Sequence, residues 1–332
     1  MGRGKKVSLF FPAQLTVRFI RWVKLGISAF SDFNTSEGSP MELLDGRLLA
    51  TQIKKELREL TAERRKLGKS VPHLAAILVG EDPASQAYVR NKVRSCEEVG
   101  FRSTLMQQPA DLSQDQLLHL IKDFNENPEI NGFIVQLPLP AGINATEVTM
   151  AINPLKDVDG FHPFNLGRMM LGLPAFLPAT PKGILEIIRR YQLETLGKHV
   201  VVVGRSHIVG TPISIMLSRK DYPGNATVTL AHSYTRNLGD ITLQADILIA
   251  ATGLPESIGA DMIKPGAVVI DVGINRVVDP TSPGGYRLTG DVHFPSVAPL
   301  TSFITPVPGG VGQLTVAALL QNTLEAAANQ DS

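Results

Sequence analysis

Strand-like and helix-like segments alternate along the chain from Leu43 onward, and this alternation limits the fold more than any other feature. Short apolar or β-branched runs predict strands, and longer segments with apolar side chains at helical spacing predict helices. Strands separated by helices indicate parallel sheets that are covered on both faces. The predicted strands are residues 74–79, 101–106, 132–135, 199–203, 226–230, 247–250 and 267–270, and the predicted helices are residues 47–67, 83–99, 113–124, 210–218 and 313–327.

A proline-rich passage at residues 153–181 divides the alternation into two series. Its prolines cannot all lie inside helices, so we interpret it as a hinge region. A length of 332 residues also favours two domains. We therefore predict two three-layer α/β/α domains with a cleft between them. The first comprises residues 41–180 together with the closing helix at 313–332, and the second, Rossmann-like, comprises residues 181–312.

The composition excludes several classes of protein. The 32 basic and 31 acidic residues nearly cancel, so nothing indicates a nucleic-acid partner. Cys96 is the only cysteine, which excludes a disulfide framework and a cysteine-based zinc site within one chain. The sequence lacks a run of roughly 18 to 20 apolar residues, so we expect no membrane span. The histidines show no metal-ligand spacing, and we expect no metal site.

Residues 1–40 differ from the rest because they are basic, poor in acids and amphipathic. Such a leader is compatible with an organellar transit peptide, which would place the protein in the mitochondrial matrix. The alternatives are a disordered extension or a start codon assigned too early, with Met41 as the true first residue. In those cases we expect a cytoplasmic protein.

The segment after the strand at 199–203 carries a candidate phosphate-binding turn. Gly204, Arg205 and Ser206 lead towards Gly210, where a helix is expected to begin. Backbone N–H groups and the helix dipole face an anion at such a turn, and glycine lets the backbone approach it. The spacing differs from G-x-G-x-x-G, so a tight turn without a ligand is the alternative.

The loop after the next strand suggests which dinucleotide is bound. An NAD-selective domain usually has an acidic residue there for the ribose 2′-hydroxyl. Residues 231–236 contain no acid, but they contain Ser233 and Arg236. Hydroxyl and cationic donors suit a 2′-phosphate, with Arg205 as a bidentate partner one loop away. This favours NADP, and a plain polar loop is the alternative.

Tyr88 and Lys92 are four residues apart in a predicted helix, so their side chains share one face. On this spacing alone, the simplest interpretation is a solvated face.

Five blocks of the sequence are distinctive when taken together: residues 80–92, 132–140, 156–162, 204–206 and 303–312. They resemble the signatures of the methylenetetrahydrofolate dehydrogenase/cyclohydrolase family, in that family's order. The resemblance covers the chain from Met41 to its C-terminus, and the leader lies outside it.

The resemblance implies a folate site in the interdomain cleft and a bifunctional, NADP-dependent, homodimeric enzyme. The implied catalytic residues are Tyr88, Lys92, Gln136 and Asp159. The implied folate contacts also include Val135 and Leu137, and the turn Pro308, Gly309, Gly310, Val311 and Gly312 would close over the folate near the nicotinamide. The implied cofactor contacts are Gly204, Arg205, Ser206, Ser233 and Ile274.

The physical chemistry of the residues agrees with these roles. Oxidation of the folate methylene yields a delocalised cation, and hydrolysis then needs only the addition of water to it. A lysine beside that cation, shielded from water, should have a lowered pKa. Neutral Lys92 could then act as general base, or it could serve only as a donor. We expect Tyr88 and Gln136 to orient it, and Asp159 to accept hydrogen bonds from the pterin.

Two alternative functions remain open at this point. A monofunctional dehydrogenase of the same fold would keep the cofactor turn but lose a working Lys92. A non-catalytic dinucleotide-binding regulator would bind NADP without folate turnover. Asp271 and Asp291 are predicted to bond backbone groups in tight turns.

Overall fold

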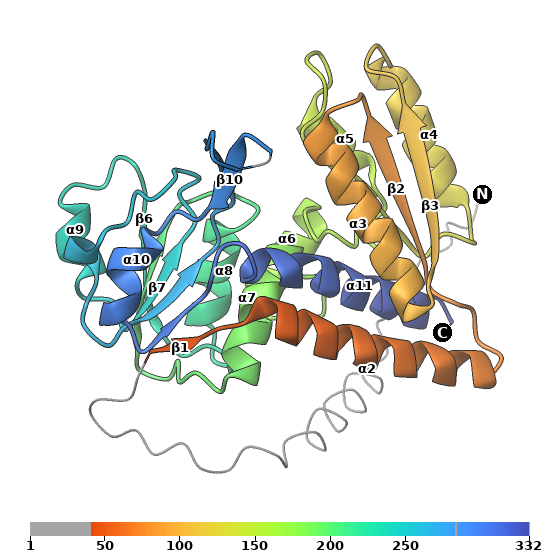
Figure 1. The fold of residues 1–332 in the computed structure, drawn as a ribbon. Helices are drawn as coiled ribbons and strands as arrows, with labels where there is room; N and C mark the ends of the chain where they lie inside the picture. The colour runs from red at the N-terminus through yellow and green to blue at the C-terminus, as the bar shows by residue number, and fades with distance from the viewer. Residues whose placement is uncertain (1–40, 283, 332) are drawn as a thin grey trace, which may run out of the picture.

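The computed structural model describes residues 41–282 and 284–331. Within them, two parallel sheets form the framework (Figure 1). A three-stranded sheet has the order β3-β2-β4, and a six-stranded sheet has the order β1-β11-β8-β7-β5-β6. This confirms the predicted two-domain α/β architecture.

The smaller sheet lies between two helical layers. Alternate residues of β2 point to opposite faces. Leu74, Ala76 and Leu78 pack in one core with helix residues such as Ile53 and Val89, whereas Ala75 and Ile77 pack in another core with the helix around Leu117. The elements of this unit are α2 (Gly46–Lys66), β2 (His73–Val79), α3 (Pro83–Val99), β3 (Arg102–Gln108), α4 (Gln114–Glu126), β4 (Gly132–Val135) and α5 (Ala145–Ala151).

The larger sheet is also buried on both faces, and its strands are all parallel. Val200 and Val202 of β5 belong to the core shared with α7, α8 and α11, and Val201 and Val203 belong to the core on the opposite face. Its elements are β1 (Glu42–Leu43), α7 (Ala179–Arg190), β5 (His199–Val203), α8 (Gly210–Ser218), β6 (Thr227–Ala231), α9 (Leu238–Thr242), β7 (Ile247–Ala250), η1 (Ala260–Met262), β8 (Val268–Asp271), α10 (Phe294–Val297), η2 (Ala298–Leu300), β11 (Phe303–Ile304) and α11 (Val311–Gln330).

The strand order places a topological switch point beside β5. The chain passes from β5 to its neighbour β6 on one side, and then to β7 on the other side. In open α/β sheets, ligands bind beyond the carboxyl ends of the strands at such a point. The turn that begins at Gly204 leaves β5 there.

Residues 42–43 fold differently from our expectation. They were predicted to lie in the first domain, but they form β1, which pairs with β11 at the edge of the larger sheet. A two-residue strand carries no readable period, so only the tertiary pairing identifies it. Helix α2 follows directly, and therefore links the edge of one sheet to the core of the other.

The proline-rich passage contains more helix than we expected. Helix α6 (Pro163–Met170) begins at Pro163, and α7 has Pro181 in its first turn. Proline is compatible with a first turn because the N–H groups there have no partner within the helix. The prolines therefore mark where these helices begin.

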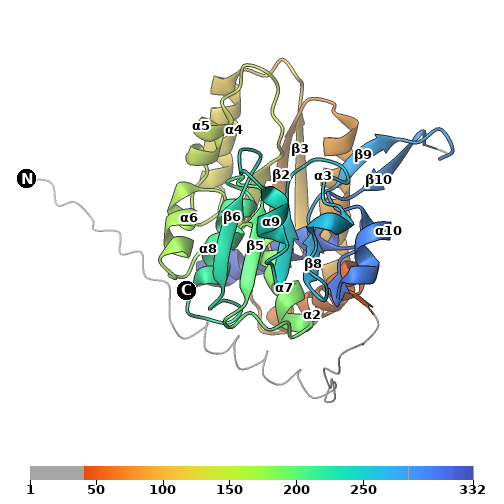
Figure 2. The same cartoon turned by 90° about the vertical axis from the view of Figure 1, so that its left-hand side faces the viewer.

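An antiparallel arm projects from the larger unit (Figure 2). It is formed by β9 (Asn275–Val278) and β10 (Tyr286–Thr289). Several apolar side chains on this arm are exposed, including Val278, Tyr286 and Leu288. Among the described residues, no helix is both long and apolar enough to cross a membrane.

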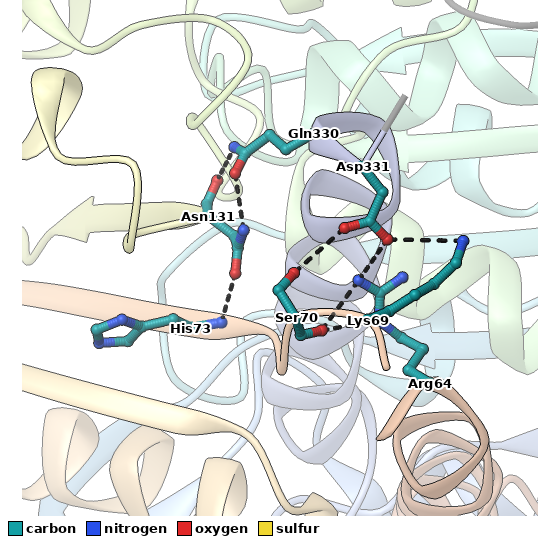
Figure 3. A network of polar contacts seen from close by, with 7 residues as sticks. All are labelled: Arg64, Lys69, Ser70, His73, Asn131, Gln330 and Asp331. Atoms are coloured by element: carbon teal, nitrogen blue, oxygen red, sulfur yellow. Dashed lines mark hydrogen bonds and ion pairs between the residues drawn. The ribbon is translucent and has the colours of Figure 1, made fainter. Parts of the chain in front are cut away.

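Helix α11 closes the fold by contacting both units. It packs against α2, α3, β2 and β4 as well as α7. Its C-terminal end is tied to the smaller unit by polar contacts (Figure 3). Gln330 and Asn131 exchange two hydrogen bonds of 2.7 and 2.9 Å, and Arg64 forms an ion pair with Asp331 at 2.9 Å.

Candidate functional site

Helix α3 carries two of the predicted site residues, and local signals define both of its ends. The Asp82 carboxylate accepts a hydrogen bond from the Ser85 N–H at 2.7 Å, and Pro83 occupies the first turn. Gly100 ends the helix in the left-handed conformation, with φ at 77°. These boundaries place Tyr88 and Lys92 on one face, which turns towards the end of β4.

The Lys92 side chain is buried, with 5% of its surface exposed. Its Nζ donates a hydrogen bond to Gln136 Oε1 at 3.2 Å and lies 4.5 Å from the centre of the Tyr88 ring. Gln136 follows β4 directly, and its backbone N–H is bonded to the carbonyl of Ile77. The Gln136 amide nitrogen is in turn bonded to the Leu137 carbonyl at 2.6 Å. Lys92 therefore has an amide oxygen and an aromatic face as close partners.

The charge of Asp159 affects both Lys92 and Tyr88. Burial lowers the pKa of Lys92, and the negative charge of Asp159 opposes that effect. Burial also raises the pKa of Asp159, against the attraction of Lys92. The pKa of Tyr88 is raised by burial first and by Asp159 second. The structure thus brings together all four residues predicted as catalytic: Tyr88, Lys92, Gln136 and Asp159.

A small cavity adjoins this cluster at the carboxyl end of β4. Val135, Leu137 and Asp159 all contribute to its lining, together with Phe133 and Phe161. Val135 is buried, whereas Leu137 is 37% exposed. Val135 and Leu137 therefore share this cavity with Asp159, whereas Tyr88, Lys92 and Gln136 do not line it.

The turn between β5 and α8 depends on glycine at two positions. Gly204 has φ at 123°, and a Cβ atom there would collide with the carbonyl oxygen of Ala251. A Cβ atom on Gly210 would collide with the carbonyl oxygen of Gly204. Ser206 Oγ accepts a hydrogen bond from the Val209 N–H at 3.2 Å, which holds the turn. The close packing at both glycines and this hydrogen bond therefore fix the shape of the turn, and residues 205–208 within it are exposed.

Arg205 and Ser233 lie on neighbouring turns at the ends of β5 and β6. Arg205 is exposed, and its guanidinium lies 5.8 Å from the centre of the Tyr234 ring. Ser233 is also exposed and directly precedes Tyr234. The two predicted 2′-phosphate contacts thus lie on turns that touch each other, and Tyr234 was not predicted to join them.

The glycine-rich turn at 308–312 contacts elements from both units. The carbonyl of Gly309 accepts a hydrogen bond from the Arg47 N–H at 3.1 Å, at the start of α2. A Cβ atom on Gly312 would approach Ile274 Cδ1 to 2.7 Å, so these two residues are in close contact. Ile274 is 59% exposed. The structure therefore joins Ile274 to this turn, although Ile274 precedes Pro308 by 34 positions along the chain.

Two buried aspartates hold the loops that follow β7 and β8. Asp271 accepts hydrogen bonds from the N–H groups of Gly273, Asp291 and Val292. Asp291 accepts them from the N–H groups of Thr252 and Gly253. Burial raises the pKa of Asp271 to about 6 although these backbone donors favour its charged form. The prediction that both aspartates bond backbone groups in turns is confirmed.

Sequence reasoning missed the loop at residues 251–253. It follows β7, next to the Gly204 turn, and so lies at the switch point. The rule that ligands bind beyond the carboxyl ends of parallel strands would have identified it.

The structure also places two of the histidines as local hydrogen-bond acceptors, since His162 accepts from Phe164 N–H and His232 accepts from Tyr234 N–H. No group of three or more His, Cys, Asp or Glu side chains that could hold a metal ion occurs among residues 41–282 and 284–331.

Two family models match the chain. Residues 44–159 match the tetrahydrofolate dehydrogenase/cyclohydrolase catalytic domain, and residues 178–331 match the NAD(P)-binding domain of the same family. The chain belongs to the tetrahydrofolate dehydrogenase/cyclohydrolase family.

Similar proteins support this membership over most of the chain. The bifunctional protein FolD of Cytophaga hutchinsonii is 56% identical over 288 residues, which cover 87% of this chain and 99% of that protein. The FolD protein of Flavobacterium psychrophilum is 57% identical, over 86% of this chain and 97% of its own length.

Solved structures of family members have the same fold. The bifunctional FolD enzyme of Campylobacter jejuni superposes with a TM-score of 0.82 at 43% identity, covering 87% of this chain and 99% of its own. The FolD enzyme of Trypanosoma brucei, solved with NADP cofactor and an inhibitor, gives 0.83 at 38% identity, covering 87% and 98%. These agreements extend over both sheets of the family fold.

Proposed function

We propose that this chain oxidises 5,10-methylenetetrahydrofolate to 5,10-methenyltetrahydrofolate with NADP and then hydrolyses the product to 10-formyltetrahydrofolate. The observation that carries this proposal is the environment of Lys92. A buried lysine with a lowered pKa, beside an amide and a tyrosine ring, is suited to proton transfer next to a cationic substrate. The close relatives are named as bifunctional FolD proteins, in agreement with two activities.

The Gly204 turn and its neighbours form the proposed NADP site. The fit is supported by the close-packed turn that the two glycines allow, by the exposed Arg205 and Ser206, and by the start of α8 at the same turn. Arg205, Ser206 and Ser233 would bind the phosphates, and no acidic side chain at the end of β6 would repel the 2′-phosphate. When bound, NADP accepts a hydride from the folate methylene carbon.

We place the proposed folate site between the Lys92 cluster of one unit and the Gly204 turn of the other. Tyr88, Lys92, Gln136 and Asp159 would surround the pterin, with Val135 and Leu137 beside it. The turn from Pro308 to Gly312 would close over the folate, and Ile274, which contacts Gly312, would touch both folate and cofactor. This positioning is what hydride transfer requires, because the two reacting carbons must be held in contact.

In the hydrolysis step, Lys92 is proposed as the general base. The oxygen of a water molecule bonds to the cationic methenyl carbon while one of its protons passes to neutral Nζ. The bond from that carbon to the N5 nitrogen then breaks as the carbinol oxygen forms the formyl C=O bond, and the proton that this oxygen loses is taken up by N5. The formyl group remains on N10, and Nζ releases its proton to solvent. Gln136 Oε1 accepts from Nζ and so directs the nitrogen, while Asp159 accepts hydrogen bonds from pterin N–H groups.

We further propose that residues 41–180 with 313–332 form the folate-binding unit and residues 181–312 form the NADP-binding unit. The contacts of α11 with α2, α3, β2 and β4 support its place in the first unit, although β1 pairs in the larger sheet.

We also propose a homodimer. The exposed apolar side chains of the β9–β10 arm support an interface, and light scattering during size-exclusion chromatography would measure the assembly.

An absorbance assay with methylenetetrahydrofolate and NADP tests the function. NADPH formation and methenyl-folate are followed separately, with the same assay repeated using NAD. We expect NADPH to form while methenyl-folate stays low, because hydrolysis consumes it. Stoichiometric accumulation of methenyl-folate would instead indicate a monofunctional dehydrogenase. Binding of NADP without any turnover would indicate a dinucleotide-binding regulator.

A further inference from the structure

Asp159 lies in a loop in which no hydrogen bond from the described residues orients its carboxylate. The neighbouring Asp157 accepts hydrogen bonds from Phe161 N–H, His162 N–H and the Asn165 amide, so that side chain is committed to the loop interior. Asp159 interacts with Lys92 through charge, and within the described part of the chain its carboxylate has no hydrogen-bond partner. The backbone on either side of Asp159 must therefore set the direction of the carboxylate.

A single side chain from the C-terminal helix holds that backbone. Asn322 is fully buried, and its Nδ2 donates to the Val158 carbonyl at 2.7 Å and to the Leu177 carbonyl at 2.9 Å. The Val158 carbonyl belongs to the peptide group that joins Val158 to Asp159. Both amide hydrogens of Asn322 are therefore used, and one of them fixes the peptide plane from which Asp159 projects.

Lys182 on α7 determines which way the Asn322 amide faces. Its Nζ donates to Asn322 Oδ1 at 2.7 Å, and an amine or ammonium donor requires the oxygen end of the amide. Glu325, on α11, lies 4.0 Å from the same Nζ. The donor end of the amide is thus directed to the two carbonyls.

The glycine that follows Asp159 is packed closely against Leu177. Gly160 has φ at 73°, and a Cβ atom there would lie 2.6 Å from the carbonyl carbon of Leu177. Asn322 bonds the carbonyl of that same Leu177. The two hydrogen bonds from Asn322 therefore join the loop segment at 158–160 to the segment at 177–178.

We propose that Asn322 is a positioning residue for the Asp159 carboxylate, acting through the Val158–Asp159 peptide. The proposal rests on the proposed role of Asp159 in binding the pterin. It places a determinant of folate affinity on the C-terminal helix, far along the chain from the other site residues.

The test compares variants of the full-length enzyme. Asn322→Leu removes all polar contacts at similar volume, and Asn322→Asp keeps the Lys182 partner but loses both N–H donors. We expect each to raise the KM for methylenetetrahydrofolate about tenfold, which corresponds to about 1.4 kcal/mol. The Kd for NADP, measured by titration, should stay within about twofold because the Gly204 turn is untouched.

Gln330→Leu provides a matched control on the same helix. Gln330 also bonds a backbone carbonyl of the smaller unit, but that of Asn131, which precedes β4, whereas Gln136 of the cluster follows β4 (Figure 3). It should lower the melting temperature while leaving the KM for folate unchanged. An equal rise in KM in Gln330→Leu, or an unchanged KM in both Asn322 variants, would overturn the proposal.

A double-mutant cycle separates this inference from the proposed function. In an Asp159→Asn background, Asn322→Asp should add less than about a twofold effect, because the carboxylate that it positions is gone. Full additivity would show that Asn322 acts elsewhere. If Asp159→Asn alone leaves the KM for folate unchanged, the proposed role of Asp159 is wrong. If Asp159→Asn raises this KM but the Asn322 variants do not, only the positioning role of Asn322 is wrong.

Discussion

Lys92 is the residue whose chemistry depends most on its surroundings. A lysine in water is almost fully charged at neutral pH, and burial is what makes its neutral form accessible. Within the described residues, Nζ donates a hydrogen bond to a neutral amide oxygen, which stabilises the charged form less than a carboxylate would. The negative charge of Asp159 opposes the lowering of the Lys92 pKa without a hydrogen bond between the two groups.

Substitution of this lysine should separate the two reactions. Lys92→Met keeps most of the volume but removes the proton acceptor, so hydrolysis should fall at least about 100-fold, the usual contribution of a general base. Hydride transfer should persist, and methenyl-folate should accumulate in the absorbance assay. Lys54→Met, which removes a lysine that pairs with Glu98 on α3, is the control and should keep both activities. Wild-type hydrolysis in Lys92→Met would show that the assigned role is wrong.

The pH dependence of hydrolysis should respond to Asp159. If neutral Lys92 is the base, kcat for methenyl-folate hydrolysis rises with pH through the Lys92 pKa. The Asp159 charge raises that pKa, so Asp159→Asn should lower it further and move the ascending limb to lower pH. Initial rates at saturating substrate, corrected for spontaneous hydrolysis, measure this shift. A limb that stays in place or moves to higher pH would exclude Lys92 as the titrating group.

Arg205 should discriminate between the two dinucleotides. A charge-assisted bond to the 2′-phosphate contributes roughly 1.5–3 kcal/mol. Arg205→Ala should therefore raise the KM for NADP by about tenfold or more, while the KM for NAD changes little. Steady-state kinetics with both cofactors provide the measurement. Equal losses would mean that Arg205 supports the turn or the pyrophosphate.

At the scale of the elements, sequence patterns succeeded where local signals and core packing agreed. Helix α3 has Asp82 and Pro83 at its start and Gly100 at its end, and its predicted bounds match the structure. The same holds for β4, β5, α8 and β7. Strands β1 and β11 were missed because each has two residues and is defined by its neighbours. Helix α7 was missed because its first turn lies in the proline-rich passage.

Replacement of Gly204 should impair binding of both dinucleotides by the β5–turn–α8 element. Gly204→Ala places a Cβ atom against the Ala251 carbonyl at a φ that is strained for any other residue, so the turn must shift. We expect binding of NADP and NAD to weaken together by about tenfold or more, unlike the selective effect at Arg205. Gly68→Ala is the control, since Gly68 also has a positive φ but lies just after α2, and a Cβ atom there meets no atom within 4 Å. Calorimetric titration with both cofactors tests the prediction, and a selective loss of NADP alone would contradict it.

At the scale of the molecule, the site could be predicted only in part from local sequence. Four-residue spacing joined Tyr88 to Lys92, but Gln136 lies 44 residues beyond Lys92 and entered through the family resemblance. No periodicity indicates that Arg205 meets Tyr234, or that Asn322 reaches the loop of Asp159. These contacts arise because α11 and the ends of parallel strands converge in space, and such convergence depends on the assembled sheets.

The last prediction concerns residues 1–40, which lie outside the described residues. Met41, the first of the described residues, packs against the core of the larger sheet. Deletion of residues 1–40 should therefore leave the melting temperature within a few degrees, or about 1 kcal/mol, with both activities retained. Deletion of residues 1–45 is the contrasting variant. It also removes β1, the buried Leu44 and the Asp45 cap of α2, and should melt several degrees lower.

An insoluble or inactive protein after the shorter deletion would show that residues 1–40 contribute to the folded core. If that deletion is silent, fusion of residues 1–40 to a fluorescent reporter distinguishes the remaining alternatives. Import into mitochondria would support a transit peptide, because basic, acid-poor leaders are the substrates of that pathway. A diffuse cytosolic signal would instead support a start at Met41, and would place the enzyme in the cytoplasm.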